Sequence, residues 1–319
     1  MAFNPASLSD LTGKVYLVTG GNAGIGYHTV RHLALHGARV YMGVRSQEKA
    51  KAAIDSILSL HPNAQIKHLI LNHLDLSTVI KAAKSLIASE TQLHGLICNA
   101  GIMATPFELS IDGHEAQWQT NYLAHWLLTQ HLLPLLLATA KVSGSGVVRI
   151  VNVSSSSHQW GPKGGIDFDD INQVHGSAFS RYAQSKLGNI LHAKTLNRLY
   201  GPRSDYAKAG NEPIWTASVQ PGYVRTQLHG RATGTWMSKL SGVVNVLMAV
   251  LGKELGVDEG SWTSLFAIAG EGFNDDMSGM YFEPLGKLAT PSKYALDEEL
   301  GDKLETYTKK VMRDGGFVE

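Results

Sequence analysis

The sequence predicts a single α/β domain, a doubly wound parallel sheet of about seven strands with helices on both faces. Three observations support this prediction. Short apolar runs alternate along the chain with longer segments of helical periodicity. A glycine-rich turn joins the first apolar run to the first helical segment, and a turn of small residues follows a later run. The chain has 319 residues, which is long enough to bury the core of such a domain.

The glycine-rich turn Thr19–Gly26 follows the apolar run Val15–Val18 and precedes a segment with one apolar helical face. Backbone N–H groups and the helix dipole make a helix N-terminus of this kind an anion site. Residues without a side chain let the backbone approach a phosphate closely. The spacing G-x-x-x-G-x-G differs from the commoner G-x-G-x-x-G. We predict a pyrophosphate site here, with a plain glycine-rich turn as the alternative.

Arg45 stands at the end of the second predicted strand, Arg39–Val44. In dinucleotide folds an acidic residue in this region bonds the ribose 2′-hydroxyl. No Asp or Glu occurs between Gly37 and Gln47, and the Arg45 guanidinium suits a 2′-phosphate. The position therefore favours NADP(H) over NAD(H). The alternative is a solvated arginine that precedes the helix Gln47–Leu60.

The remaining apolar and periodic segments predict the later elements. Strands are expected at 66–71, 93–98, 147–153 and 216–220, and helices at 78–91, 115–137 and beyond Tyr182. Ser77 is the expected cap of the helix at 78–91. Asn121 lies inside an apolar helix, where an unpartnered amide is costly. We expect it either to bond a local carbonyl or to hold an ordered water.

Composition excludes several classes of function. A formal charge of +1 gives no reason to expect nucleic acid or an anionic membrane as partner. The 14 histidines are scattered without a metal-ligand spacing, so no metal site is expected. The single cysteine, Cys98, excludes an internal disulfide and suits a reducing compartment. Because Met1–Gly13 lacks a basic signal-peptide region and no uninterrupted apolar run is long enough for a membrane span, we expect a soluble cytoplasmic protein.

Two stretches beyond the strand at 147–153 carry candidate chemistry. Four serines, Ser154–Ser157, follow the strand directly and would alone indicate a polar loop. Tyr182 and Lys186 lie four residues apart and share one face of a helix. On a generic surface helix such a pair is usually only packing.

Taken together, the motifs resemble those of the short-chain dehydrogenase/reductase family over residues 11–284. The motifs that carry the resemblance are Thr19–Gly26, Asn99-Ala100-Gly101, Asn121, Asn152-Val153-Ser154-Ser155, Tyr182-x-x-x-Lys186 and Pro221-Gly222. Further features are similar to the retinol dehydrogenase and WW-domain-oxidoreductase branch: Val40-Tyr41-Met42 before Arg45, Leu74–Ser77, Asp112-Gly113 and Ser278–Phe282. The resemblance implies a Rossmann fold with a cofactor half at about 11–155 and a catalytic half at about 156–319.

The resemblance also implies the catalytic roles. Tyr182 would be the general acid in carbonyl reduction and the base in alcohol oxidation. Lys186 would lower the pKa of the phenol and bond the nicotinamide ribose. Ser155 would hydrogen-bond the substrate oxygen, with Ser156 as the alternative. Asn121 would hold a water that relays protons past Lys186.

Cofactor contacts follow from the same resemblance. The pyrophosphate turn would contain Gly20, Asn22, Gly24, Ile25 and Gly26, and Arg45 would bind the 2′-phosphate. Asp75 and Leu76 would flank adenine, while Asn99, Gly101, Pro221, Val224 and Thr226 would line the remainder of the cofactor together with Tyr182 and Lys186. Ala23 stands where many NADP-dependent relatives have a basic residue, so the preference for NADP(H) depends on Arg45.

Two variable regions are expected to contact the substrate. The insertion His158–Ser180 contains Trp160, Phe168 and Phe179. The region 227–260 has apolar residues at helical spacing, which predicts a small helical lid, a helix packed on the core, or a surface that contacts a membrane or partner. His158 is either a substrate contact or a structural loop histidine.

Three functions and two oligomeric states are open. The first function is NADPH-dependent reduction of a ketone or aldehyde of a hydrophobic metabolite, as in a biosynthetic pathway. The second is NADP⁺-dependent oxidation of a retinol- or steroid-type alcohol, and the third is a non-catalytic nucleotide-sensing protein. Relatives often pair through the helices that carry Asn121 and Tyr182. The insertion before Tyr182 would obstruct that surface, so either a homo-oligomer or a monomer is expected.

Overall fold

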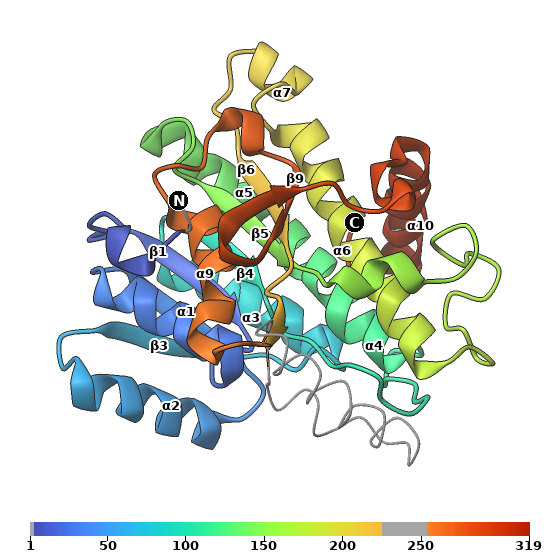
Figure 1. Ribbon diagram of the computed structural model, residues 1–319, viewed down its shortest axis with the longest axis horizontal. Helices are drawn as coiled ribbons and strands as arrows, with labels where there is room; N and C mark the ends of the chain where they lie inside the picture. The colour runs from blue at the N-terminus through green and yellow to red at the C-terminus, as the bar shows by residue number, and fades with distance from the viewer. Residues whose placement is uncertain (1–2, 225–253) are drawn as a thin grey trace.

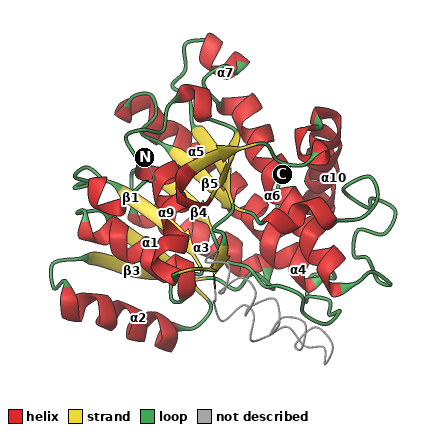
Figure 2. Cartoon of the chain, viewed as in Figure 1, coloured by secondary structure: helices red, strands yellow, loops and turns green. Residues whose placement is uncertain are grey.

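The centre of the computed structural model, which describes residues 3–224 and 254–319, is an eight-stranded sheet (Figures 1 and 2). The strand order is β10-β9-β6-β5-β4-β1-β2-β3. Seven strands run parallel, as predicted, and β10 adds an antiparallel edge strand that pairs with β9. The sheet strands are β1 (Val15–Thr19), β2 (Arg39–Val44), β3 (Gln65–Ile70), β4 (Gly95–Cys98), β5 (Arg149–Val153), β6 (Trp215–Val219), β9 (Met280–Glu283) and β10 (Lys287–Ala289). Two short strands, β7 (Tyr223–Val224) and β8 (Glu254–Leu255), pair separately.

Helices cover both faces of the sheet. One face packs against α1 (Gly24–Leu35), α2 (Gln47–Leu60) and α9 (Val257–Ala269). The other packs against α3 (Leu76–Ser89), α5 (Ala124–Ser143), α6 (Ala178–Tyr200) and α10 (Glu298–Asp314). Shorter elements are α4 (Ala116–Trp118), α7 (Asp205–Lys208) and the 3-10 turns η1 (Pro5–Ser7), η3 (Ser156–Trp160), η5 (Asp275–Met277), η6 (Pro284–Gly286) and η7 (Lys293–Leu296).

The strand β1 shows why this sequence forms a sheet covered on both sides. Successive side chains of a strand point to opposite faces. Val15 and Leu17 accordingly enter the core beneath α3 and α5, while Tyr16 and Val18 enter the core beneath α1 and α9. All four are buried, which accounts for the continuous apolar run that predicted the strand.

The start of α3 corrects one prediction. Asp75, and not Ser77, is the N-cap residue, and the helix begins at Leu76 rather than at Thr78. Asp75 Oδ1 accepts hydrogen bonds from the backbone N of Ser77 at 3.1 Å and from its hydroxyl at 2.7 Å. Asp is as strong an N-cap residue as Ser, and here the acid precedes the serine in the chain.

The predicted helix at 115–137 is divided by a π-turn. It consists of α4, the π-turn Gln119–Leu123 and α5, which continues through Pro134 to Ser143. Among the described residues, the stretch Ala116–Ser143 alone is long and apolar enough to cross a membrane, with a mean hydropathy of 1.2. Because 72% of this window is buried within the protein, we assign it as a core helix. The π-turn matters for the site, since it contains Asn121.

The C-terminal helix α10 packs against α6 (Figure 1). Trp126 Nε1 donates to the buried carboxylate of Glu305 at 2.8 Å, and the hydroxyls of Tyr122 and Thr308 are 2.9 Å apart. Phe168, from the insertion before α6, packs edge-on against Tyr307 of α10 with ring centroids 5.6 Å apart. The insertion and α10 therefore cover this side of the molecule together.

Candidate active site

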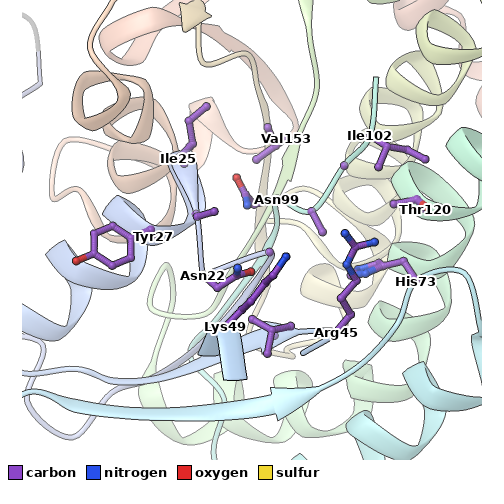
Figure 3. Close-up of a pocket in the computed structure, with 18 of the residues that line it drawn as sticks. Asn22, Ile25, Tyr27, Arg45, Lys49, His73, Asn99, Ile102, Thr120 and Val153 are labelled. Carbon is purple, nitrogen blue, oxygen red and sulfur yellow. The ribbon is translucent and has the colours of Figure 1, made fainter. Parts of the chain in front are cut away.

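A cleft of about 690 Å³ opens where the chain leaves the carboxyl ends of β1, β2, β3, β4 and β5. Its lining combines the glycine-rich turn with residues from four other connections, and Figure 3 shows part of it. Among the predicted site residues, those that line it are Gly20, Asn22, Gly24, Ile25, Gly26, Arg45, Asn99, Gly101, Tyr182, Lys186 and Pro221. The sequence motifs that lie far apart along the chain thus meet in one cleft.

The glycine-rich turn can adopt its shape only with glycine at specific positions. Gly20 and Gly24 have φ values of 66° and 56°, a region that residues with side chains rarely adopt. A Cβ on Gly26 would lie 2.3 Å from the Gly20 carbonyl oxygen and 2.6 Å from Nδ2 of Asn99. Ala23, which precedes α1, supplies no side-chain cap. The first N–H groups of α1 therefore remain available to an anion in the cleft.

The hydroxyl of Thr19 joins this turn to the end of β4. Thr19 Oγ1 accepts hydrogen bonds from the backbone N of Asn99 at 2.9 Å and of Ala100 at 3.0 Å. Nδ1 of the buried His125 donates to the Asn121 carbonyl at 2.9 Å, so its Nε2 accepts from Thr19 Oγ1 at 2.8 Å. His125 belongs to none of the sequence motifs. Its position four residues after Asn121, on the same helical face, was the available signal.

Two cations lie at the end of the cleft formed by β2 and α2. Arg45 is exposed at the end of β2, as predicted, and Lys49 lines the cleft from the first turn of α2 (Figure 3). Neither side chain forms an ion pair with a carboxylate among the residues the structure describes. Lys49 was missed by the sequence analysis, although its spacing of four residues from Arg45 was visible.

The residues predicted to flank adenine are not among those that line the cleft, and their contact with adenine stays a prediction. Asp75 and Leu76 do not line the cleft: Asp75 caps α3, and the backbone N of Leu76 donates to Asp112 Oδ2 at 3.0 Å. Asn72 and His73, three residues earlier, line it instead. The reason is the N-cap at Asp75, which places the connection between β3 and the helix earlier in the chain than the sequence motif suggested.

Tyr182 and Lys186 both point into the cleft region from α6 and are buried. Lys186 Nζ donates to the Val153 carbonyl at 3.0 Å and lies 5.7 Å from the centroid of the Tyr182 ring. Burial raises the pKa of Tyr182 to about 12, and a hydrogen bond with Ser155 acts in the opposite direction. Burial lowers the pKa of Lys186 to about 8. At pH 7 the phenol is therefore protonated and most of the lysine is charged.

The serines after β5 have separate structural roles. Ser155, the N-cap of η3, contacts Tyr182 and accepts a hydrogen bond from the backbone N of Ser157 at 3.1 Å. Ser154 lines the cleft, and its hydroxyl donates to the Lys186 carbonyl at 2.7 Å. Ser156 is exposed. Of these serines, Ser155 is the one that the structure brings to the phenol.

The side chain of Asn121 is fully occupied by the protein. Its Oδ1 accepts from the backbone N of Ile102 at 2.9 Å. Its Nδ2 donates to the Ile102 carbonyl at 3.0 Å and to the Ser185 hydroxyl at 2.8 Å. This arrangement matches the expectation of a bond to a carbonyl, with the partner in the β4 connection instead of in the helix. A role in holding a water stays a prediction.

Several predicted substrate contacts lie elsewhere. His158 is buried, donates from Nδ1 to the Ser155 carbonyl at 2.7 Å and accepts from the backbone N of Ser292 at 3.0 Å. It is thus the structural loop histidine of the two alternatives. Trp160 is 69% exposed. Of the two residues predicted to contact the cofactor after β6, Val224 and Thr226, Val224 is buried in β7. Thr226 and the predicted lid up to residue 253 lie outside the described residues. No group of three potential metal ligands occurs in the described part of the chain.

The glycine-rich turn generates the first testable prediction. Gly26→Ala should abolish dinucleotide binding, because its Cβ would overlap the Gly20 carbonyl and force the turn away from Asn99. Dissociation constants from fluorescence titration with NADPH would measure the effect. Gly272→Ala is the matched control, since a Cβ there has no neighbour closer than 3.6 Å. Binding by Gly26→Ala at the strength of the control would contradict this account of the turn.

Comparisons with known proteins agree with the geometry of the cleft. Residues 14–168 match the family described as short chain dehydrogenase. The short-chain dehydrogenase/reductase drtF of Aspergillus calidoustus is 51% identical over 312 residues, which cover 97% of this chain and 96% of that protein. The chloroplastic short-chain dehydrogenase TIC 32 A of Brassica napus is 34% identical, covering 93% and 88% of the two chains. An uncharacterized protein from Mycobacterium paratuberculosis has a similar crystal structure, with a TM-score of 0.72, 27% identity and 98% coverage of both chains. The chain therefore belongs to the short-chain dehydrogenase/reductase family.

Proposed function

We propose that the protein is an NADP(H)-dependent oxidoreductase that reduces a ketone or aldehyde of a hydrophobic small metabolite. The observation that carries the proposal is that Tyr182 and Lys186 line a cleft built on a glycine-rich turn, with Ser155 hydrogen-bonded to Tyr182 although it does not itself line the cleft. The nicotinamide supplies the hydride when it is bound. Tyr182 donates a proton to the substrate oxygen, Ser155 orients that oxygen, and Lys186 provides positive charge beside the phenol.

The preference for NADP(H) is supported by Arg45 and Lys49. Two cations without a carboxylate partner among the described residues, at the end of β2, suit a phosphate dianion. The described lining of the cleft contains no Asp or Glu that would select the ribose hydroxyl of NAD(H). Lys49 adds a second charge to the single arginine on which the sequence argument depended.

The protonation state of Tyr182 in the free protein suits the role of general acid in the proposed reduction. With a pKa of about 12, only about one phenol in 10⁵ is deprotonated at pH 7 in the free protein. A general acid needs the proton that such a phenol holds, whereas a general base must lose it. Oxidation of a retinol- or steroid-type alcohol is the second candidate, and a non-catalytic nucleotide sensor is the third.

A hydrophobic substrate is supported by the apolar residues of the cleft. Ile102, Met103, Val153 and Pro221 line it together with the catalytic pair. Apolar walls with few polar groups are typical of sites for small hydrophobic ligands. We also propose a cytoplasmic location, since the buried Cys98 is the single thiol of the chain.

Loss of the phenol tests the assignment of Tyr182. Tyr182→Phe should lower the turnover of carbonyl reduction by about 10²-fold or more, because general acid catalysis contributes at this scale. The affinity for NADPH should change less than about threefold, since the ring and Lys186 remain. Steady-state kinetics and fluorescence titration measure the two effects, with Tyr206→Phe on α7 as the control. Near wild-type turnover would refute the role of Tyr182 and favour the sensor hypothesis.

Charge reversal tests the cofactor preference. Arg45→Asp should shift the ratio of kcat/KM for NADPH over NADH by about 100-fold toward NADH, because a charge-assisted bond is lost and a repulsive carboxylate is added. Lys49→Ala should shift the ratio in the same direction by a smaller factor. Lys84→Asp, on the exposed surface of α3, makes the same charge change away from the cleft. An unaltered ratio in Arg45→Asp would show that this residue does not bind the phosphate.

We further propose that the protein is a monomer, since α10 and Phe168 cover the α5 and α6 side of the molecule. Light scattering coupled to gel filtration should then give a mass near 34.5 kDa across the accessible concentration range. A mass of twice that value would contradict the proposal, and would leave the catalytic assignment untouched.

A further inference from the structure

The short turn after Ser155 contacts the interior of the protein through one histidine. A 3-10 turn has poor hydrogen-bond geometry and adds little stability of its own. Of the residues in η3, His158 alone is buried, with 1% of its surface exposed. The other residues of the turn are exposed or half-buried. The position of η3, and of the Ser155 that caps it, therefore depends on the contacts of His158.

One nitrogen of His158 fixes the peptide group of Ser155. Nδ1 donates to the Ser155 carbonyl oxygen at 2.7 Å, and the backbone N of His158 donates to the same oxygen at 3.1 Å. Two bonds to one carbonyl restrict the rotation of this peptide, and with it the direction in which the serine side chain leaves the backbone. The Ser155 hydroxyl contacts Tyr182. His158 therefore acts on the contact with the phenol through the backbone.

The other nitrogen connects this turn to the C-terminal part of the chain. Nε2 accepts from the backbone N of Ser292, which lies 134 residues later, at 3.0 Å. The ring packs edge-on against Tyr281 of β9, with ring centroids 5.3 Å apart. A further bond joins the same two regions, from the backbone N of Gly164 to the hydroxyl of Tyr294 at 3.2 Å. The imidazole thus lies between the turn after β5 and residues of the C-terminal segment.

These contacts define the tautomer of His158. A carbonyl oxygen can only accept, so Nδ1 must donate, and a backbone N–H can only donate, so Nε2 must accept. Burial lowers the pKa of His158, and the bond to the Ser155 carbonyl raises it by a smaller amount. The pKa is therefore below the usual value for histidine, and the neutral ring is the main form at pH 7. Both nitrogens of that ring are fully used by the backbone.

We propose that His158 is a positioning residue for the reduction, which sets the direction of the Ser155 hydroxyl and anchors it to the segment at Ser292. The inference rests on the proposed function, because it assumes that Ser155 orients the substrate oxygen. His158 is not among the residues that line the cleft, so it acts only through the serine. Its loss should accordingly change the chemical step and leave cofactor binding intact.

Three substitutions of His158 distinguish its two nitrogens. His158→Leu removes both side-chain bonds and should lower kcat about 10- to 100-fold, because a displacement of about 1 Å at a reacting group has effects of this size. His158→Asn keeps an amide donor near the place of Nδ1 and should retain kcat within about fivefold of wild type. His158→Gln, whose amide reaches the place of Nε2, is the matched control and should be as slow as His158→Leu.

The measurements are steady-state kinetics with NADPH and para-nitrobenzaldehyde, a hydrophobic carbonyl probe, and fluorescence titration with NADPH. The Kd for NADPH should stay within about twofold of wild type in all three variants, since the lost bonds lie outside the cleft. His94→Leu controls for loss of a buried histidine elsewhere. Its Nδ1 accepts from the backbone N of Val15 at 3.0 Å, at the end of the sheet opposite the cleft. That variant should lower the melting temperature and leave kcat unchanged.

A double-mutant cycle with Ser155 separates positioning from a general loss of structure. In Ser155→Ala the hydroxyl is absent, so adding His158→Leu should lower the remaining kcat by less than about twofold. An equal factor of loss in both backgrounds would overturn the inference and identify a purely structural histidine. So would wild-type kcat in His158→Leu, or equal kcat values in His158→Asn and His158→Gln. If His158→Leu does not fold, the comparison of Asn with Gln decides alone.

Failure of the proposed function gives a different result. Wild-type protein that oxidises NADPH with no member of a panel of hydrophobic aldehydes and ketones would refute the reduction, and the inference with it. Full turnover in Ser155→Ala would refute the role of the serine, and therefore also the positioning role of His158, while the assignment of Tyr182 would stand.

Discussion

The close contact between the glycine-rich turn Thr19–Gly26 and the end of β4 is the constraint on which the rest of the site depends. Gly26 has no room for a Cβ beside the Gly20 carbonyl and the Asn99 amide. Thr19 closes the same contact from the other side, since its hydroxyl accepts two backbone N–H groups and Asn99 Nδ2 donates to its carbonyl at 2.8 Å. The glycine-rich turn and the connection after β4, which line the cleft together with Tyr182 and Lys186, are thereby fixed to each other. Neither can move without leaving buried polar groups unpartnered.

From this contact, a chain of hydrogen bonds reaches the catalytic helix. The connection after β4 continues to Ile102, whose backbone N and carbonyl both bond the Asn121 side chain. Asn121 also donates to the Ser185 hydroxyl, which lies between Tyr182 and Lys186 on α6. The π-turn brings the amide into this network, and π-turns are frequent at functional sites for such reasons. A substitution at Asn121 would therefore affect the positions of both catalytic side chains, whatever its role toward water.

Much of the fold and of the candidate site could be predicted from the sequence, because the patterns that indicate them lie within short stretches of the chain. Apolar runs predicted the parallel strands, and Tyr182 and Lys186 required only helical spacing. The prediction of Ser77 as the helix cap is wrong because Asp75, two residues earlier, is an equally good N-cap residue. The antiparallel β10 had no distinctive local pattern, and the spacing of His125 from Asn121 did not indicate its partner. Their roles arise from partners that are distant in the chain, such as Thr19 for His125.

Burial changes the pKa values of Tyr182 and Lys186 in opposite directions. Removal from water disfavours charge, so the pKa of Tyr182 rises to about 12 while that of Lys186 falls to about 8. In the free cleft the Tyr182 phenol therefore keeps its proton, while Lys186 loses its proton at a lower pH than a lysine in water does. Both groups are protonated below about pH 8, and rising pH then removes the charge of Lys186. Because the Lys186 ammonium is hydrogen-bonded to the Val153 carbonyl, its charge is placed by the backbone of β5. The strand that precedes the serines therefore also positions the cation, and Tyr182 and Lys186 lie at the edge of the same parallel sheet that forms the cleft.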